Sequence, residues 1–169
     1  MARLFALDHN FPQPIVSVLS QFQTAAELVR VDAIDPRLTD LDDCELLLAL
    51  NHHDRAWDGL ITTDSSILNQ GPELAALIAT RLTLVVAREA GHNPVKASGL
   101  LFAYLEGICG RTDPDKAQVW TLSAANRASA DPWESLKRFA AHNNRAVEDV
   151  WEQFRLSADA LARNPLDET

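Results

Sequence analysis

The stretch LFALD, at residues 4–8, is a short apolar run that ends on an acid, Asp8. Such a run is typical of a buried strand in a parallel sheet, because helices cover both faces of that sheet. A second run, GLITTD at residues 59–64, has the same form and ends on Asp64. The carboxyl ends of parallel strands lie on one edge of the sheet, so we expect Asp8 and Asp64 to meet there.

A third group of acids opens a predicted helix at residues 41–53. Crossover helices begin on the edge where the strands end, so Asp42, Asp43 and Glu45 are expected beside that edge. Acids in a first helical turn also stabilise the helix by about 0.3–1 kcal/mol, which is the purely structural interpretation. Asp43 is the strongest candidate of the three, because it lies three residues before Leu46 on the face expected to be buried.

Strands and helices alternate along the first two-thirds of the chain. Strands are predicted at residues 3–8, 27–34, 58–63, 81–87 and 118–122, and helices at residues 12–21, 41–53, 73–80 and 94–108. This alternation is typical of a three-layer α/β/α fold with a parallel sheet of four or five strands and right-handed crossovers. We therefore predict an α/β domain over residues 1–122.

The remaining part of the chain has a different pattern. Residues 123–130 are small and polar and are predicted to form a linker. Apolar residues then repeat at helical spacing, which predicts a helical C-terminal extension at residues 131–162, followed by a frayed tail at residues 163–169. The residues expected to pack against the α/β domain, or against a protein partner or a second copy in a homodimer, are Trp133, Val150, Trp151 and Phe154.

Composition and charge limit the classes of function. The chain has 169 residues, of which 47% are hydrophobic, and its net charge of -9 argues against broad, non-specific adhesion to nucleic acid. No apolar run approaches the ~20 residues that span a bilayer, and the first residues do not resemble an export signal. Cys44 and Cys109 lack the spacing of metal ligands. We expect a reduced, cytoplasmic protein without membrane contact.

Three motifs, taken in order, resemble those of a known family. They are LDxNxP at residues 7–12, DxxLL at residues 43–47 and LITTD at residues 60–64. This order resembles the PIN-domain nucleases, and it is most similar to the small stand-alone PIN-like proteins related to VapC-like toxins. The resemblance is good over residues 3–86, fades over the following helix and does not extend to residues 117–169.

Membership of this family would imply a PIN-like domain with Mg²⁺ or Mn²⁺ as cofactor and endoribonuclease activity on RNA. Such proteins are often one half of a toxin–antitoxin pair, so an antitoxin protein would be a partner. By position, Asp8, Asp43 and Asp64 match three acids of the family's metal site and are the catalytic candidates. The secondary candidates for the metal are Asn10, which matches the polar residue beside the first acid, and Asp42, Glu45 and Ser66.

Clustered carboxylates suit phosphodiester hydrolysis, because a hard divalent cation needs oxygen ligands and can activate water. One position departs from the family pattern. Relatives usually carry a further Asp or Asn shortly after the third acid, where this chain has Ser66, and the nearest amide is Asn69. Fewer carboxylates give weaker cation binding.

Two other functions are left open by these residues. One is a degenerate, non-catalytic PIN-like module that binds protein or RNA, in which the fourth acid is missing and the aromatic C-terminal helices hold a partner. The other is a phosphatase of the haloacid-dehalogenase type that uses Asp8. That class carries Asp-x-Asp after the first strand, where this chain has Asp8, His9 and Asn10.

Overall fold

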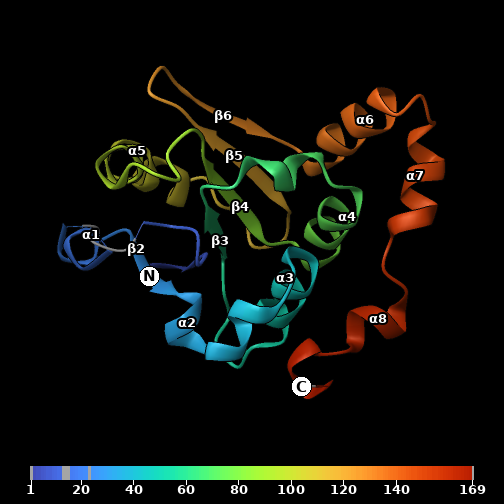
Figure 1. Ribbon diagram of the computed structural model, residues 1–169, viewed down its shortest axis with the longest axis horizontal. Coiled ribbons are helices and arrows are strands. Elements are labelled where there is room, and N and C mark those ends of the chain that lie inside the picture. The colour runs from blue at the N-terminus through green and yellow to red at the C-terminus, as the bar shows by residue number, and fades with distance from the viewer. Residues whose placement is uncertain (1, 13–15, 23, 169) are drawn as a thin grey trace.

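The computed structural model describes residues 2–12, 16–22 and 24–168 and has an α/β fold (Figure 1). The sheet has six strands in the order β2-β1-β3-β4-β5-β6. β1 to β5 run parallel to one another, as the alternation of elements predicts. The strands are β1 (Arg3–Leu7), β2 (Ala26–Arg30), β3 (Gly59–Thr62), β4 (Thr83–Ala87), β5 (Gln118–Leu122) and β6 (Arg127–Ala130).

The sixth strand corrects two predictions, the sheet of four or five strands and the linker at residues 123–130. β6 pairs antiparallel with β5. The turn between them is closed by Ser123, whose backbone N–H donates to the Asn126 carbonyl at 2.9 Å. β6 is an edge strand whose side chains are half-buried or exposed, so small polar residues are sufficient to form it. For this reason the strand carries no apolar pattern in the sequence.

The second predicted strand, at residues 27–34, ends earlier than expected. β2 stops at Arg30, and Val31–Ile34 form a one-turn helix, α2, followed by the 3₁₀ helix η2 (Pro36–Asp40). The Arg30 guanidinium donates two hydrogen bonds of 3.0 Å to the Asp32 carboxylate. This local contact bridges the end of β2 and the first turn of α2, and so favours a turn over a longer strand.

Helices cover both faces of the sheet. α1 (Val16–Phe22) and α5 (Pro94–Cys109) lie on one face, and α3 (Asp43–His52) and α4 (Gly71–Thr80) lie on the other (Figure 1). Part of the predicted helix at residues 12–21 lies outside the described residues. The arrangement is compatible with a three-layer α/β/α fold.

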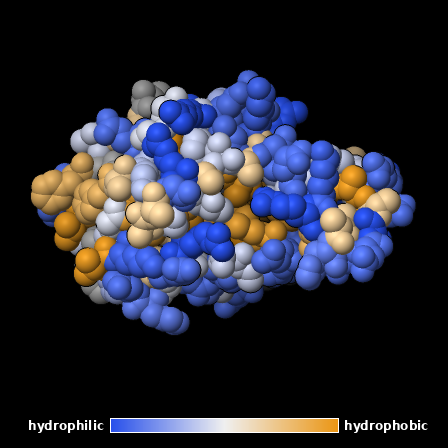
Figure 2. Space-filling view, turned by 90° about the horizontal axis from the view of Figure 1, so that it is seen from above, coloured by the Kyte–Doolittle hydropathy of each residue, from blue (hydrophilic) through white to orange (hydrophobic). Residues whose placement is uncertain are grey.

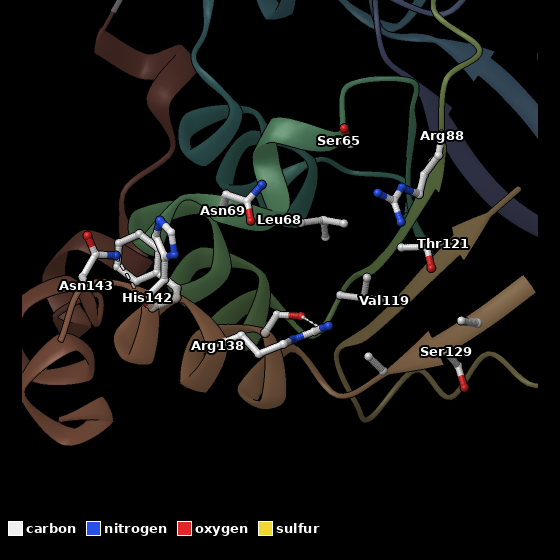
Figure 3. Close-up of a pocket in the computed structure, with 14 residues that line it drawn as sticks. Ser65, Leu68, Asn69, Arg88, Val119, Thr121, Ser129, Arg138, His142 and Asn143 are labelled. Atoms are coloured by element: carbon white, nitrogen blue, oxygen red, sulfur yellow. Dashed lines mark hydrogen bonds between the residues drawn. The ribbon is translucent and has the colours of Figure 1, made fainter. Parts of the chain in front are cut away.

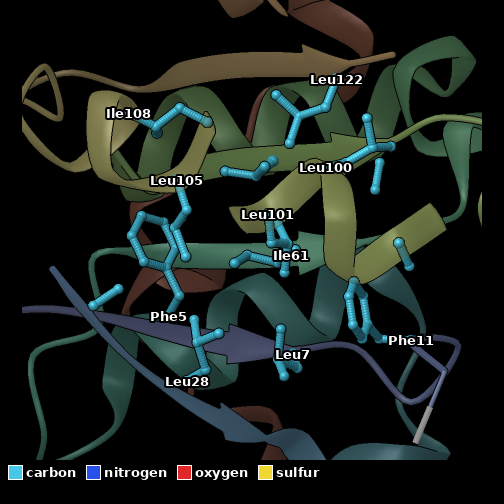
Figure 4. Close-up of a cluster of buried hydrophobic side chains, with 14 of the residues drawn as sticks. Phe5, Leu7, Phe11, Leu28, Ile61, Leu100, Leu101, Leu105, Ile108 and Leu122 are labelled. Atoms are coloured by element: carbon cyan, nitrogen blue, oxygen red, sulfur yellow. The ribbon is translucent and has the colours of Figure 1, made fainter. Parts of the chain in front are cut away.

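Successive side chains of the strands fill two separate apolar cores. On β1, Phe5 and Leu7 belong to the core beneath α5, whereas Ala6 belongs to the core beneath α3 and α4. Figure 4 shows the first core, in which Leu101 and Leu105 of α5 lie over the strands. Because both faces of the sheet are covered, its strands read as continuous apolar runs in the sequence.

The C-terminal extension packs against α4. Its helices are α6 (Pro132–His142), α7 (Val147–Phe154) and α8 (Ala158–Ala162), which run down one side of the molecule (Figure 1). A third apolar cluster joins α4 to α6 and α7, and its fully or almost fully buried members are Leu74, Leu136, Ala140 and Val150. The extension therefore shares a core with the α/β part of the chain.

The predicted burial of the extension's apolar residues is confirmed. Val150 is fully buried, and Trp133, Trp151 and Phe154 are partly buried against the same cluster. The rings of Trp133 and Trp151 meet edge to face, with centroids 5.4 Å apart. Gly71 opens α4 where α7 approaches most closely, since a Cβ at this residue would lie 2.6 Å from ring carbons of Phe154. A glycine at this position therefore lets α7 pack against α4.

The tail is folded up to residue 168, which corrects the prediction that residues 163–169 fray. Pro165–Glu168 form a 3₁₀ helix, η4. Arg37 Nη1 donates to the Leu166 carbonyl at 3.1 Å, and Leu166 packs against the core beneath α3. One apolar side chain and one backbone acceptor hold the tail, although most of its residues are polar.

Apolar side chains are also exposed at one end of the molecule. They are Val18 and Phe22 of α1 and Val95 and Phe102 of α5. In Figure 2, apolar surface gathers at the left end, where α1 and α5 lie in Figure 1. Among the described residues, no helix combines the length and the apolar character that crossing a bilayer would require.

We expect Leu136→Ala to lower the free energy of unfolding by about 2–5 kcal/mol, because this fully buried side chain would leave a cavity between α6 and α4. Unfolding should remain a single cooperative transition, since the two helices share a core. Urea unfolding followed by circular dichroism measures both quantities. Val95→Ala is the control, at a side chain that is 75% exposed, and should change stability by less than about 0.5 kcal/mol. Two separate transitions would mean that the extension folds independently.

Candidate functional site

The strand order reverses beside β1. The chain passes from β1 to β2 on one side of β1, and β3 then lies on the other side. Open α/β sheets bind ligands in the crevice outside the carboxyl ends of the strands at such a switch point. Asp8 directly follows β1, and Asp64 follows β3 by two residues. Both acids therefore lie where the topology favours a binding site.

The Asp8 side chain is buried, with 2% of its surface exposed. Its Oδ2 accepts hydrogen bonds from Thr62 Oγ1 at 2.8 Å and from Asn10 Nδ2 at 3.3 Å. Its Oδ1 has no hydrogen bond, because His9 Nδ1, although 2.9 Å away, does not have hydrogen-bonding geometry. A buried carboxylate oxygen without a donor is costly. Asp8 is therefore held through Oδ2 by Thr62 and Asn10, while Oδ1 lacks a hydrogen bond and has the His9 ring as its neighbour.

Asp64 is fixed from both sides along the chain. Its backbone N–H donates to Thr62 Oγ1 at 3.0 Å, and its Oδ1 accepts from the Ser66 backbone N–H at 2.8 Å. The second bond caps the 3₁₀ helix η3 (Ser65–Asn69), which is the structural role expected of an acid at this position. Ser66 itself is exposed beside Asp64. The Thr62 hydroxyl thus links Asp8 and Asp64 directly.

Asp43 is the first residue of α3 and is half-buried. Its pKa is raised to about 6, first by burial and then by the negative charges of Asp8, Asp64, Glu73 and Asp42, in that order. The two largest charge contributions come from the acids that follow β1 and β3. Charges that raise a pKa lie near the titrating group, so the three candidate acids lie along one edge of the sheet, although they do not form a group spaced to hold a metal ion.

Asp42 and Glu45, two secondary candidates, cap α3. Asp42 Oδ1 accepts from the Glu45 backbone N–H at 2.8 Å, and Glu45 Oε2 accepts from the Asp42 N–H at 3.3 Å. This reciprocal pair is a capping box, and it satisfies two backbone donors that the helix leaves unpaired. Capping of α3 therefore accounts for the presence of both Asp42 and Glu45.

Glu73, in the first turn of α4, is a fourth acid of the site that the sequence did not reveal. It is only 9% exposed, and its Oε2 is buried without a hydrogen-bond partner among the described residues. Burial raises the pKa of Glu73, and the charge of Asp42 raises it further. The residue follows β3 by eleven positions, behind Pro72, and only the packing of α4 against α3 brings it to the acids. Its sequence context resembles an ordinary first helical turn.

Neither cysteine is a nucleophile in this arrangement. Burial, followed in importance by the charge of Asp42, raises the pKa of the Cys44 thiol to about 11. Burial likewise raises the pKa of Cys109 to about 11. Both side chains stay protonated at neutral pH, and a thiol without its thiolate form does not react as a nucleophile.

The acids supply the donor type that Mg²⁺ and Mn²⁺ prefer, which is oxygen alone. Asp8 Oδ1 and Glu73 Oε2 are buried oxygens without a hydrogen bond among the described residues. However, no three His, Cys, Asp or Glu side chains of the described residues form a group already spaced to hold a metal ion. The residues fit a cation by chemistry, and closer approach of the carboxylates would be needed to surround it.

A pocket of about 940 Å³ opens beside Ser65, the residue that follows Asp64. It is bounded by η3, the ends of β4 and β5, β6 and α6 (Figure 3). The residues that line the pocket are Ser65, Leu68, Asn69, Arg88, Val119, Thr121, Ala128, Ser129, Ala130, Ser135, Arg138, Phe139, His142 and Asn143.

Comparisons of the chain with protein-family models, with curated proteins and with solved structures gave no match.

Asp43→Asn should stabilise the protein at neutral pH by about 1–2 kcal/mol. The folded-state pKa of about 6 lies above the usual 3.8, so the folded protein keeps a proton that the unfolded chain releases between these values. The stability of the wild type therefore falls relative to the variant as the pH rises from about 4 to 6, and the difference is constant above that. The full shift would be worth about 3 kcal/mol, which solvent screening of a half-buried group reduces.

Urea unfolding of both proteins between about pH 4 and pH 8 measures this difference. Asp32→Asn is the matched control, because the hydrogen bond from Arg30 lowers the pKa of Asp32. Its loss should destabilise the protein by an amount that hardly changes between about pH 8 and pH 4, because the lowered pKa lies below this range. A difference between Asp43→Asn and the wild type that does not change with pH would contradict the electrostatic account of the site.

Proposed function

We propose that this protein is a metal-dependent endoribonuclease of PIN type, in which Asp8, Asp43 and Asp64 hold Mg²⁺ or Mn²⁺ and RNA is the substrate. The observation that carries the proposal is the position of these acids at the carboxyl edge of the sheet, where the Thr62 hydroxyl joins Asp8 to Asp64 and where burial and neighbouring charge raise the pKa of Asp43. Carboxylates that repel one another at the carboxyl edge of a sheet are stabilised together by a cation. The role as toxin of a toxin–antitoxin pair rests on the family resemblance alone.

The three acids differ in their surroundings, which supports different roles. Asp8 is buried and oriented by Thr62, so it would be the fixed ligand. Asp64 is tied to the chain through one oxygen and would offer the other. Asp43, whose pKa is raised to about 6, would release its proton when the ion binds and would complete the set of ligands. A divalent ion held by these oxygens would neutralise charge on the phosphate and acidify bound water.

Glu73 would supply the carboxylate that relatives carry at the position where this chain has Ser66. A serine at this position leaves the site one carboxylate short of the usual set. Glu73 adds a carboxylate from α4, buried and with a free Oε2. We include Glu73 in the proposed site as the fourth acid, in place of the residue that relatives carry after Asp64.

The second candidate function is a non-catalytic PIN-like module that binds protein or RNA. The observation in its favour is that the described acids are not yet spaced as metal ligands. On this alternative, Asp64 is only the cap of η3, and Asp43 is only an acid at a helix start. The two functions differ in what a divalent cation does to the protein.

Thermal unfolding measured with and without Mn²⁺ distinguishes the nuclease from the non-catalytic binding module. If the acids bind the ion, Mn²⁺ at about 100 times its dissociation constant should stabilise the wild type by ~2.7 kcal/mol, or roughly 5–10 °C in Tm. Asp8→Asn and Asp64→Asn should lose most of this gain. Asp115→Asn is the control, at an exposed acid in the turn before β5, on the opposite edge of the sheet, and should keep it. An equal shift in all four proteins, or none, favours the binding module.

Cleavage of labelled single-stranded RNA tests the catalytic part. The wild type should cleave with Mg²⁺ or Mn²⁺ and stop with EDTA. Asp64→Asn should lower the rate by at least ~100-fold, since removing even a group that supports a metal ligand typically costs ~10–100-fold. Asp115→Asn should cleave as the wild type does. Equal rates for the wild type and Asp64→Asn would assign the cleavage to a contaminant and refute the proposed site.

A further inference from the structure

The pocket beside Ser65 carries positive charge in an acidic protein. The chain has 24 acidic and 15 basic side chains, but the pocket lining contains Arg88, Arg138 and His142 and not one acid. A concave surface that gathers cations without carboxylates attracts anions, because its charge is not neutralised locally.

Neither pocket arginine has a carboxylate partner among the described residues, whereas five other arginines have one. Ion pairs occupy Arg3, Arg30, Arg37, Arg55 and Arg155. Among the described residues, Arg88 has no ion pair, and Arg138 donates only to the Ser135 hydroxyl at 3.1 Å. Figure 3 shows their guanidinium groups pointing into the pocket from opposite sides. Both groups therefore keep donors free for a ligand.

The backbone that carries these arginines is firmly held. Arg88 directly follows β4, and its N–H donates to the Leu122 carbonyl at 3.0 Å. Arg138 lies on α6, which the buried Leu136 and Ala140 fix against α4. Ser135, its hydrogen-bond partner, is 3% exposed. A planar guanidinium on a rigid support is suited to binding a phosphate through two parallel hydrogen bonds.

The pocket is continuous in sequence and space with the acidic edge, since Ser65 lines it and Asp64 precedes Ser65. Arg88 and Thr121 stand at the carboxyl ends of β4 and β5, on the same edge as the acids. We infer that this pocket binds the phosphodiester backbone of single-stranded RNA next to the phosphate that the acids hold. The inference rests on the proposed nuclease function and adds to it the place where the RNA strand would lie beside the acids.

The size and lining of the pocket favour a single strand. Its volume of about 940 Å³ is at the upper end of the ~300–1,000 Å³ usual for ligand sites, so it has room for more than a phosphate group. Asn69 and Asn143 offer donors and acceptors for base edges, and Phe139 offers an aromatic ring. Double-stranded RNA is recognised along the outside of its helix rather than in a concave pocket.

Fluorescence anisotropy with a labelled uridine decamer, in EDTA, tests the inference without cleavage. The double variant Arg88→Gln/Arg138→Gln should bind at least about tenfold more weakly than the wild type. The slope of log K against log salt should fall by about 1.4, because each phosphate contact of a single strand contributes about 0.7. Arg111→Gln is the matched control, an exposed arginine on the opposite edge of the sheet, and should bind as the wild type does.

Three results would overturn the inference. They are absence of decamer binding by the wild type, the same affinity and salt slope in the double variant, and displacement of the decamer by an RNA duplex or a polyglutamate peptide as readily as by unlabelled decamer. Failure of the proposed nuclease function gives a different result. In that case Mn²⁺ stabilisation and cleavage are absent, while arginine-dependent RNA binding in EDTA persists.

Discussion

The Thr62 hydroxyl donates to Asp8 Oδ2 at 2.8 Å and accepts from the Asp64 backbone N–H at 3.0 Å. This one group joins the ends of β1 and β3, the two strands between which the sheet reverses its order. The position of Asp8 depends on it, because the other hydrogen bond to this buried carboxylate among the described residues, from Asn10, is longer at 3.3 Å. The turn into η3, and with it Ser65 at the mouth of the pocket, begins from the same bond.

The acids at this edge are electrostatically unfavourable in the folded protein. Asp43 and Glu73 both have raised pKa values, and burial is the first cause in each case. Buried acids that repel one another persist where the surrounding structure holds them in place. Such groups commonly mark sites that bind a ligand or catalyse a reaction. Here the restraint comes from two apolar cores that fix β1, α3 and α4 independently of the acids.

The features of the site that the sequence predicted are those that follow from the direction of the strands. Asp8 and Asp64 could be placed at one edge because each ends an apolar run, and Asp43 because it opens a helix with a buried leucine face. Glu73 could not, since only the packing of α4 brings it to the site. Strand β6 was hidden because an edge strand needs little burial, and the folded tail because the contacts of Leu166 with the core and with Arg37 are long-range. What the sequence missed thus depends on long-range contacts, which periodicity does not encode.

The packing of α6 and α7 against α4 has a consequence for the order in which the chain folds. All five parallel strands and the helices between them precede residue 123, so this part of the sheet can pair before the rest of the chain exists. In the described part of the chain, Leu74 on the outer face of α4 packs against residues of α6 and α7. During synthesis from the amino end, that face stays open to solvent and to chaperones until the extension has left the ribosome. Docking of α7 at Gly71 therefore belongs to the last steps of folding.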